Sequence, residues 1–149
     1  MTPAETAFLL ACDAVIKDRL QSPASYQRFS AAPVTRQPAA LLVFLRVETP
    51  EKMAQRAVLE QKDPRLAETR KGLTDWFNAR ARDEASSFIE YDATNAFGAS
   101  LRSGAKCTTF IDKDAPFKVD ATSSIRVDNM TKLDWDVQAL HNLNSQTGG

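Results

Sequence analysis

An amphipathic helix at the amino terminus is the feature that most constrains the fold. Thr2 is followed by a proline at the first helical position and by Glu5, the pattern of a capping box. The helix is expected to end near Gln21, because Ser22-Pro23 disfavours its continuation. We expect its apolar face to pack on a sheet. That face consists of Phe8, Leu9, Cys12, Val15, Ile16 and Leu20, which recur at helical spacing.

A β-hairpin is the second strong prediction. Residues 87–94 place Ile89, Tyr91 and Ala93 on one strand face. Residues 95–98 (Asn-Ala-Phe-Gly) supply turn chemistry, because Asn and Gly tolerate the left-handed conformation. Residues 101–111 form the return strand. Its two expected faces are Leu101, Ala105 and Cys107 on one side, and Arg102, Lys106 and Thr108 on the other.

The remaining patterns complete an α+β fold, a long helix on an antiparallel sheet with a helical insertion between strands. Strands are expected at 26–31, 41–48 and 124–129, with a loop around Pro33 and Pro38. Proline-led helix starts at Thr49-Pro50 and Asp63-Pro64 predict two helices within 51–86. A short capped helix is expected over 131–143. We predict one domain over 1–143 and a flexible tail over 144–149.

The charge balance argues against two classes of partner. Nineteen basic residues balance nineteen acidic ones, which favours neither nucleic acid nor an anionic membrane as partner. The longest apolar run, 39–45, is too short to span a bilayer, so we predict no membrane insertion. No signal peptide precedes the first helix. That fits a cytoplasmic protein, or a mature chain whose leader was removed.

Catalytic motifs are sparse. A histidine triad would depend on the single histidine, His141, which is more simply a surface residue. Two cysteines and one histidine far apart do not make a zinc site, and no phosphate-binding glycine motif is present. We therefore predict no catalytic, metal-binding or cofactor-binding residues and no cofactor. Acid pairs such as Glu90 and Asp92, Asp112 and Asp114, or Asp134 and Asp136 leave a carboxylate-based hydrolase as a minor hypothesis.

The two cysteines admit two interpretations. Cys12 lies on the apolar face of the first helix, and Cys107 lies on the apolar face of the return strand. If that helix packs on that face, a disulfide could close a loop of about 95 residues and contribute roughly 4 kcal/mol. Two buried thiols acting as small hydrophobes are an equal alternative. A disulfide would indicate an oxidising compartment.

Four side chains are candidates for contact with a partner: Trp76, Phe77, Phe97 and Arg102. Aromatic residues and arginine are favoured at interface hot spots. The alternative for Trp76 and Phe77 is that they anchor the insertion to the core. Phe97 lies in the hairpin turn, which usually faces solvent.

Two segments carry a resemblance. The first runs from Ala11-Cys12 through Leu20 and Ser22-Pro23 to Phe29, and the second runs from Tyr91 through the Asn95–Gly98 turn to Cys107. Together they resemble a loose group of small, uncharacterised bacterial domains, often exported or associated with the envelope. In that group a Cys-bearing helix and an L-x-S-P-x-S-x-x-F segment precede an N-x-F-G hairpin closed by a second cysteine. The resemblance covers about a third of the chain and favours the disulfide.

The leading hypothesis is therefore a non-enzymatic protein-binding or structural domain of the bacterial envelope, periplasmic or secreted. Its partner is expected to be another protein, and its oligomeric state is undetermined. The alternative is a cytoplasmic protein-binding module of the inhibitor or immunity type, suggested by the absent leader and the two charged helices of the insertion.

Overall fold

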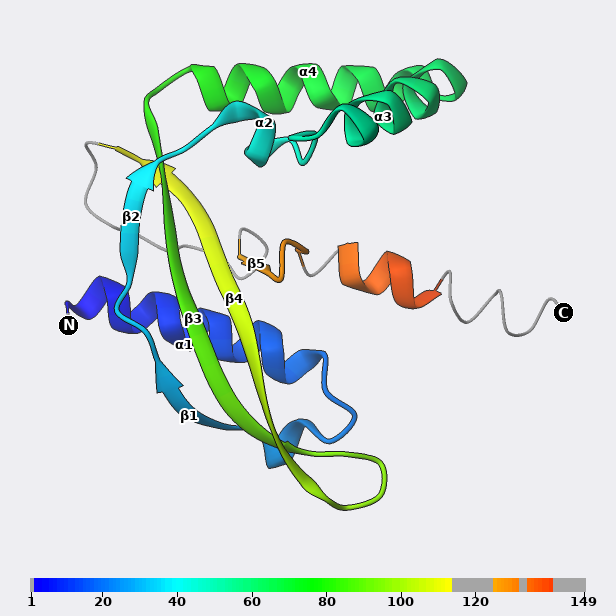
Figure 1. Ribbon diagram of the computed structural model, residues 1–149. Helices are drawn as coiled ribbons and strands as arrows, with labels where there is room; N and C mark the ends of the chain where they lie inside the picture. Colours follow the sequence, from blue (N-terminus) through cyan, green and yellow to red (C-terminus); the bar gives the residue numbers. More distant parts are fainter. Residues whose placement is uncertain (1, 114–124, 132–133, 141–149) are drawn as a thin grey trace, which may run out of the picture. The chain divides into compact units, whose positions relative to one another are not determined.

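The computed structural model describes residues 2–113, 125–131 and 134–140 (Figure 1). The chain divides into two compact units. The first consists of residues 1–36, 85–109 and 117–149, and the second of residues 37–84 and 110–116. Strands β3 (Arg82–Thr94) and β4 (Ser100–Asp112) contribute residues to both units. The single domain predicted over 1–143 therefore stays a prediction, and the predicted tail lies outside the described residues.

The fold is α+β, as predicted from the sequence. Among the described residues, five strands form one sheet in the order β1-β3-β4-β5, and β2 also pairs with β3. Besides β3 and β4, the strands are β1 (Gln27–Ala31), β2 (Thr35–Pro38) and β5 (Arg126–Val127). The predicted insertion of helices between strands is confirmed, since α3 (Pro50–Lys62) and α4 (Pro64–Asn78) separate β2 from β3.

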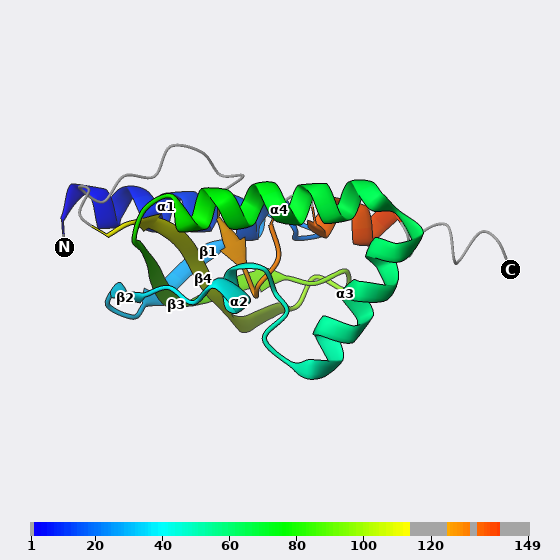
Figure 2. The same ribbon diagram turned by 90° about the horizontal axis from the view of Figure 1, so that it is seen from above.

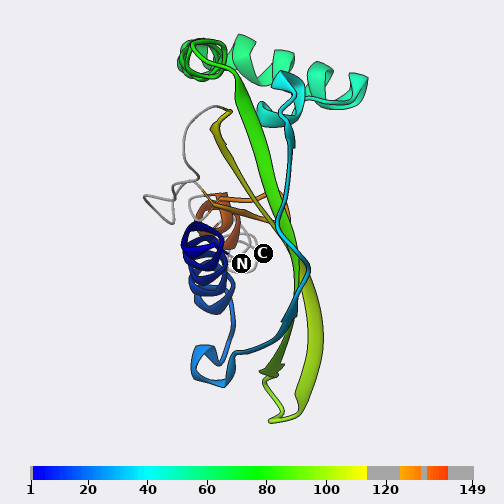
Figure 3. The same cartoon turned by 90° about the vertical axis from the view of Figure 1, so that its left-hand side faces the viewer.

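The amino-terminal helix α1 (Pro3–Asp18) starts as its sequence predicts. The Thr2 hydroxyl accepts a hydrogen bond from the Glu5 backbone N–H at 3.2 Å, which satisfies one of the free donors of the first turn. The helix lies against one side of the strands of the first unit (Figure 3). A 3₁₀ turn, η1 (Pro23–Ser25), then leads the chain into β1.

The core of the first unit forms between α1 and the sheet. Cys12 and Cys107 are joined by a disulfide, with their Cα atoms 6.1 Å apart, so the helix is covalently attached to β4. The apolar face of α1 is buried as predicted, apart from Leu20, which is partly buried. The buried core residues are Phe8, Leu9, Cys12, Val15, Ile16, Ile89, Ala105, Cys107, Ile125 and Val127.

The carboxy-terminal segment is fixed to the end of α1 by one arginine. The Arg19 guanidinium donates to the carbonyl oxygens of Val127 and Met130, both at 2.7 Å, and lies 4.9 Å from the ring centre of Trp135. Of the strand predicted over 124–129, the described residues 125–129 contain only β5. Residues 134–140 are helical. Thr131 and Asp134 exchange capping hydrogen bonds at the start of this helix, as predicted.

The second unit is built on an aromatic cluster. Phe44 lies within about 5 Å of three rings, those of Trp76, Phe77 and Phe110. The Arg82 guanidinium lies 3.7 Å from the centre of the Trp76 ring, donates to the Trp76 carbonyl oxygen and pairs with Asp112. Helices α3 and α4 diverge from the corner at Asp63-Pro64 (Figure 2).

The buried strand predicted over 41–48 is wrong. Residues Leu41–Phe44 form a short helix, α2, which is followed by a turn with Arg46 at a positive φ of 60°. Its backbone groups bond locally, as from Leu45 N–H to the Leu41 carbonyl, rather than to a neighbouring strand. A short apolar run in a sequence does not distinguish a helix from a strand. The helix forms here because it buries Phe44 in the aromatic cluster.

Two further boundaries differ from expectation. The segment with Pro33 and Pro38, predicted as a loop, contains β2. The helical insertion ends at Asn78, and β3 begins at Arg82 rather than near Ser87. Asp83 and Glu84 are buried in this early part of β3. Because acidic residues are rare in strand interiors, the local sequence did not indicate that the strand begins before these residues.

We predict that reduction of the disulfide lowers the free energy of unfolding by about 4 kcal/mol, because the released chain regains the entropy of a loop of 95 residues. Urea denaturation with and without reductant measures the difference. The double variant Cys12→Ala, Cys107→Ala is the matched control and should not respond to reductant. A reductant effect of equal size in that variant would contradict the prediction.

Candidate functional site

The face of the sheet opposite α1 is the most distinctive surface of the first unit. Ile89 and Tyr91 of β3 contact the core under α1, so the alternation of a strand places Phe88 and Asp92 on the other face. The same rule applied to Ala105 of β4 puts Arg102 and Gly104 there. Within the described residues of this unit, no helix covers this side (Figure 3). We call Phe29, Phe88, Asp92, Arg102 and Gly104 the outer face.

Arg102 is held in a fixed position on the outer face. Its Nε and Nη2 atoms donate to the two carboxylate oxygens of Asp92 at 3.0 and 3.1 Å, a bidentate pair. Its guanidinium carbon lies 3.5 Å from the centre of the Phe29 ring. Phe29 reaches this position from β1, where the register shifts between Arg28 and Ser30. The bulge turns the Phe29 side chain toward Arg102.

Two phenylalanine rings remain largely in water on this face. Phe29 is 58% exposed and Phe88 is 50% exposed. The tip of the Phe88 ring lies over Gly104, because a Cβ atom at that glycine would collide with the Cζ atom of the ring. The glycine therefore leaves room for the tip of the ring over β4. Exposed aromatic rings and an ordered arginine on one sheet face have the composition of interface hot spots.

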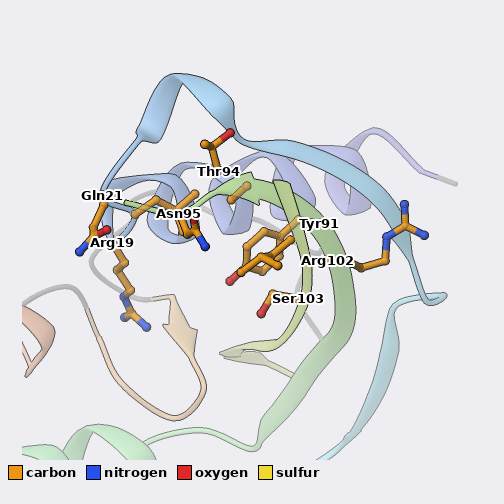
Figure 4. Close-up of a pocket in the computed structure, with 10 residues that line it drawn as sticks. Arg19, Gln21, Tyr91, Thr94, Asn95, Arg102 and Ser103 are labelled. Carbon is orange, nitrogen blue, oxygen red and sulfur yellow. The ribbon is translucent and has the colours of Figure 1, made fainter. Parts of the chain in front are cut away.

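A cavity of about 350 Å³ lies on the other face, between the end of α1 and the hairpin. Figure 4 shows Tyr91 and Ser103 of the sheet together with Arg19 and Gln21 from the segment that follows α1. The Arg102 side chain points away from these residues. The wall is completed by Leu20, Ala93, Thr94, Asn95 and Leu101.

Neighbouring side chains fix the cavity wall. The Tyr91 ring packs against Tyr26, with ring centres 5.3 Å apart, and the Tyr26 hydroxyl donates to Asp13 at 2.5 Å. Burial, followed by the hydrogen bond to Asp13, raises the pKa of Tyr26. Burial lowers the pKa of Arg19, and Asp128 opposes this shift. The hydrogen bonds of Arg19 therefore hold the side of the cavity next to α1, and the contact between Tyr26 and Tyr91 holds the side at the sheet.

The hairpin turn forms as predicted. Gly98 has a φ of 80°, which glycine adopts without strain, and the Asn95 side-chain oxygen accepts from the backbone N–H groups of Phe97 and Ala99. The turn is thereby ordered, while the Phe97 side chain is 95% exposed. Leu101, expected on the apolar face, is exposed beside the turn, whereas Thr108 of the other face is buried.

The four predicted contact residues are divided between the two units. Arg102 lies on the outer face, and Phe97 lies at the tip of the hairpin. Trp76 and Phe77 belong to the aromatic cluster of the second unit. Phe77 is only 8% exposed, so little of its ring is available to a partner, while Trp76 is partly exposed under Arg82.

Sequence reasoning missed Phe29 and Phe88 as surface residues. Both lie in segments predicted as strands, and strand phenylalanines are usually buried. The alternation of side chains along the strand could have revealed that Phe88 is exposed. Phe88 is out of phase with Ile89 and Tyr91, and this phase alone places it on the face away from α1.

No catalytic arrangement is seen in the described part of the chain. No cluster of three or more His, Cys, Asp or Glu side chains could hold a metal ion there. A second cavity, of about 410 Å³, lies among α2 and α4 and contains Asp75 as its one acid. Neither cavity is lined by two carboxylates, and the hydrolase hypothesis stays a prediction. His141 and Asp114 lie outside the described residues.

Comparison of the chain with protein-family models, curated proteins and solved structures finds no match. None of the helices in the described residues is long and apolar enough to cross a membrane. The assignment of function therefore rests on the geometry of the chain itself.

We predict that Arg102→Ala raises the pKa of Asp92. In the native protein the hydrogen bonds from Arg102 hold the Asp92 pKa below its ordinary value of 3.8. A lowered folded-state pKa means that the pair stabilises the fold above pH 3.8 and that this contribution is lost as the pH falls through the folded value. An NMR titration of the Asp92 carboxylate measures both pKa values. Identical titration curves in the two proteins would contradict the pairing.

Proposed function

We propose that this chain is a non-enzymatic protein-binding domain of the bacterial cell envelope, and that the outer face is its contact surface. The observation that carries the proposal is the exposed Phe29 ring under Arg102, which Asp92 orients, together with the exposed Phe88 on the same sheet face. Such a surface loses little side-chain entropy on binding, because its arginine is already held in one geometry.

The arrangement of layers supports a role for this face outside the core. The opposite face of the same strands is filled by α1, so folding of the first unit does not require Phe29 and Phe88 to be buried by it. Large apolar side chains that gather on one uncovered sheet face are typical of interaction surfaces. Their burial by a partner would contribute to the binding free energy through the hydrophobic effect, and Arg102 would add a polar contact that depends on the orientation of the partner.

The disulfide supports the envelope location. Disulfides persist in oxidising compartments such as the periplasm and are rare in the reducing cytosol. The Cys12–Cys107 bond joins the first helix to β4 inside the core. The resemblance to exported bacterial domains agrees with this location. Mass measurement after thiol alkylation of the chain isolated from its native compartment tests it, and two free thiols there would contradict the proposed location.

An inhibitor-type module that binds through the helical insertion is the second candidate. Several apolar side chains of α3 and α4 are exposed, and the cavity among α2 and α4 has Leu41, Leu42 and Leu45 beside Arg70 and Lys71. In this alternative the contact surface belongs to the second unit. The two candidates therefore differ in which residues a bound partner touches.

Site-specific photo-crosslinking in living cells separates these candidates. We expect p-benzoyl-phenylalanine placed at Phe29 to form an adduct with another protein. The same group placed at Val58 of α3, which is 51% exposed, should form none. Adducts at position 58 and none at position 29 would contradict the outer-face proposal and favour the helical insertion.

We also expect the yield of crosslinking at position 29 to depend on the other residues of the outer face. Phe88→Ser should weaken adduct formation at position 29, because it removes a second exposed apolar side chain of the outer face and leaves the core intact. Circular dichroism serves as the control for folding. Undiminished crosslinking in a folded Phe88→Ser protein would place the contact elsewhere.

A further inference from the structure

Helix α3 of the second unit buries none of its side chains. It has 13 residues, and each of them is at least partly exposed in the described part of the chain. A helix of this length is only marginally stable in water, and most protein helices gain stability by burying one face. Polar contacts hold α3 near its ends instead. The Thr49 hydroxyl accepts from the Lys52 N–H at 3.2 Å, and Glu60 pairs with Arg70 of α4 at 2.9 Å.

One side of α3 is apolar and faces water. Four residues at helical spacing form this apolar face of α3: Met53, Ala54, Ala57 and Val58. All four are exposed. Arg56 and Glu60 are partly buried on a different side, which Glu60 directs toward α4 by its pair with Arg70. The apolar face therefore has the pattern of a helix that packs on a further surface, and α4 does not supply that surface.

Two charged residues without partners border the apolar face. Glu51 lies in the first turn of α3 and Lys62 in the last. Positions 51, 55, 58 and 62 follow one another along one side of a helix, so both charges lie on the flank next to Val58. Within the described residues, neither side chain forms an ion pair. The remaining charged side chains of α3 are paired inside the chain.

These features are complementary to a second copy of α3 in antiparallel orientation. Residues 51 and 62 are equally far from the middle of the helix, so a two-fold axis there puts Glu51 level with Lys62 of the second copy, and Lys62 level with Glu51. The short side chain of Ala57 meets its own counterpart, which lets the helix axes approach to about 8 Å. A parallel pair would instead place like charges together, which disfavours that orientation.

We propose that the apolar face of α3 is a self-association surface, through which two copies of this chain form a two-fold dimer. Met53 packs near Val58 of the second copy, and a pair between Glu51 and Lys62 closes each end of the contact. Two helices of 13 residues are each only about 20 Å long, so the contact is smaller than a standard interface and the dimer exchanges in solution. The dimer uses the second unit and is independent of the outer face.

Sedimentation equilibrium of the purified, oxidised chain from about 1 µM to 1 mM tests the proposal. We expect a monomer–dimer equilibrium without larger species, because a two-fold contact closes on itself. Ala57→Glu should abolish the dimer, since it places two like charges at the axis. The matched control is Leu59→Glu on the opposite side of α3, where Leu59 is 49% exposed, and it should associate like the native chain. A monomer throughout, or equal association of both variants, would overturn the proposal.

A charge exchange tests the antiparallel pairing. Glu51→Lys and Lys62→Glu should each weaken self-association at least about fivefold, because two attractive pairs become repulsive. An equimolar mixture of these two variants should form a heterodimer of nearly native affinity, since one chain then carries lysine at both positions and the other carries glutamate. Fluorescence anisotropy of one labelled variant measures this. The mixture contains the same chains as the separate samples, so a folding defect would not produce the heterodimer. A mixture no more associated than its components would overturn the pairing.

The outcomes also separate this inference from the proposed function. With p-benzoyl-phenylalanine at Val58, an adduct of twice the mass of the chain joins two copies and supports the dimer, and it is distinct from an adduct with a different protein. A dimer without any adduct at Phe29 would support α3 pairing and contradict the outer face. Adducts at Phe29 in a chain that stays monomeric would do the reverse. A monomeric chain whose position 58 reacts with a different protein would assign α3 to that protein and overturn the second copy.

Discussion

The attachment of α1 to the sheet is the contact on which the rest of the first unit depends. The apolar face of the helix covers Ile89, Ala105 and Cys107, and the Cys12–Cys107 bond fixes this contact covalently. Because one layer of helix suffices to bury one face of the strands, the opposite face is left to water. At the other end of α1, Arg19 holds the carboxy-terminal segment through the carbonyl groups of Val127 and Met130. The helix thus organises the core, the cavity and the exposed face together.

The exposed features follow from strand geometry rather than from special residues. Alternation places Phe88, Asp92 and Arg102 away from α1, and the bulge in β1 brings Phe29 beneath Arg102. The same alternation directs the backbone N–H and carbonyl groups of Arg102 and Gly104 away from β3.

Local sequence predicted the elements whose signals are local. The capped start of α1 and the turn at Asn95–Gly98 depend on Thr2, Asn95 and Gly98 and on their immediate neighbours. The prediction failed where burial decided the conformation. Residues 41–44 form a helix because Phe44 joins three aromatic rings that come from distant positions. The start of β3 was not predicted because it contains the buried acids Asp83 and Glu84, and acidic residues are uncommon in strands.

The sequence by itself determined the α+β class, the amphipathic first helix and the hairpin, because capping, periodicity and turn chemistry act over a few residues. It also placed both cysteines on apolar faces, but it did not determine whether they form a disulfide. Only the tertiary structure brought Cys12 to Cys107, placed Arg102 over Phe29 and paired β4 with β5 at Cys107 and Thr108. Each of these depends on the register and packing of segments far apart in the chain, which no local pattern records.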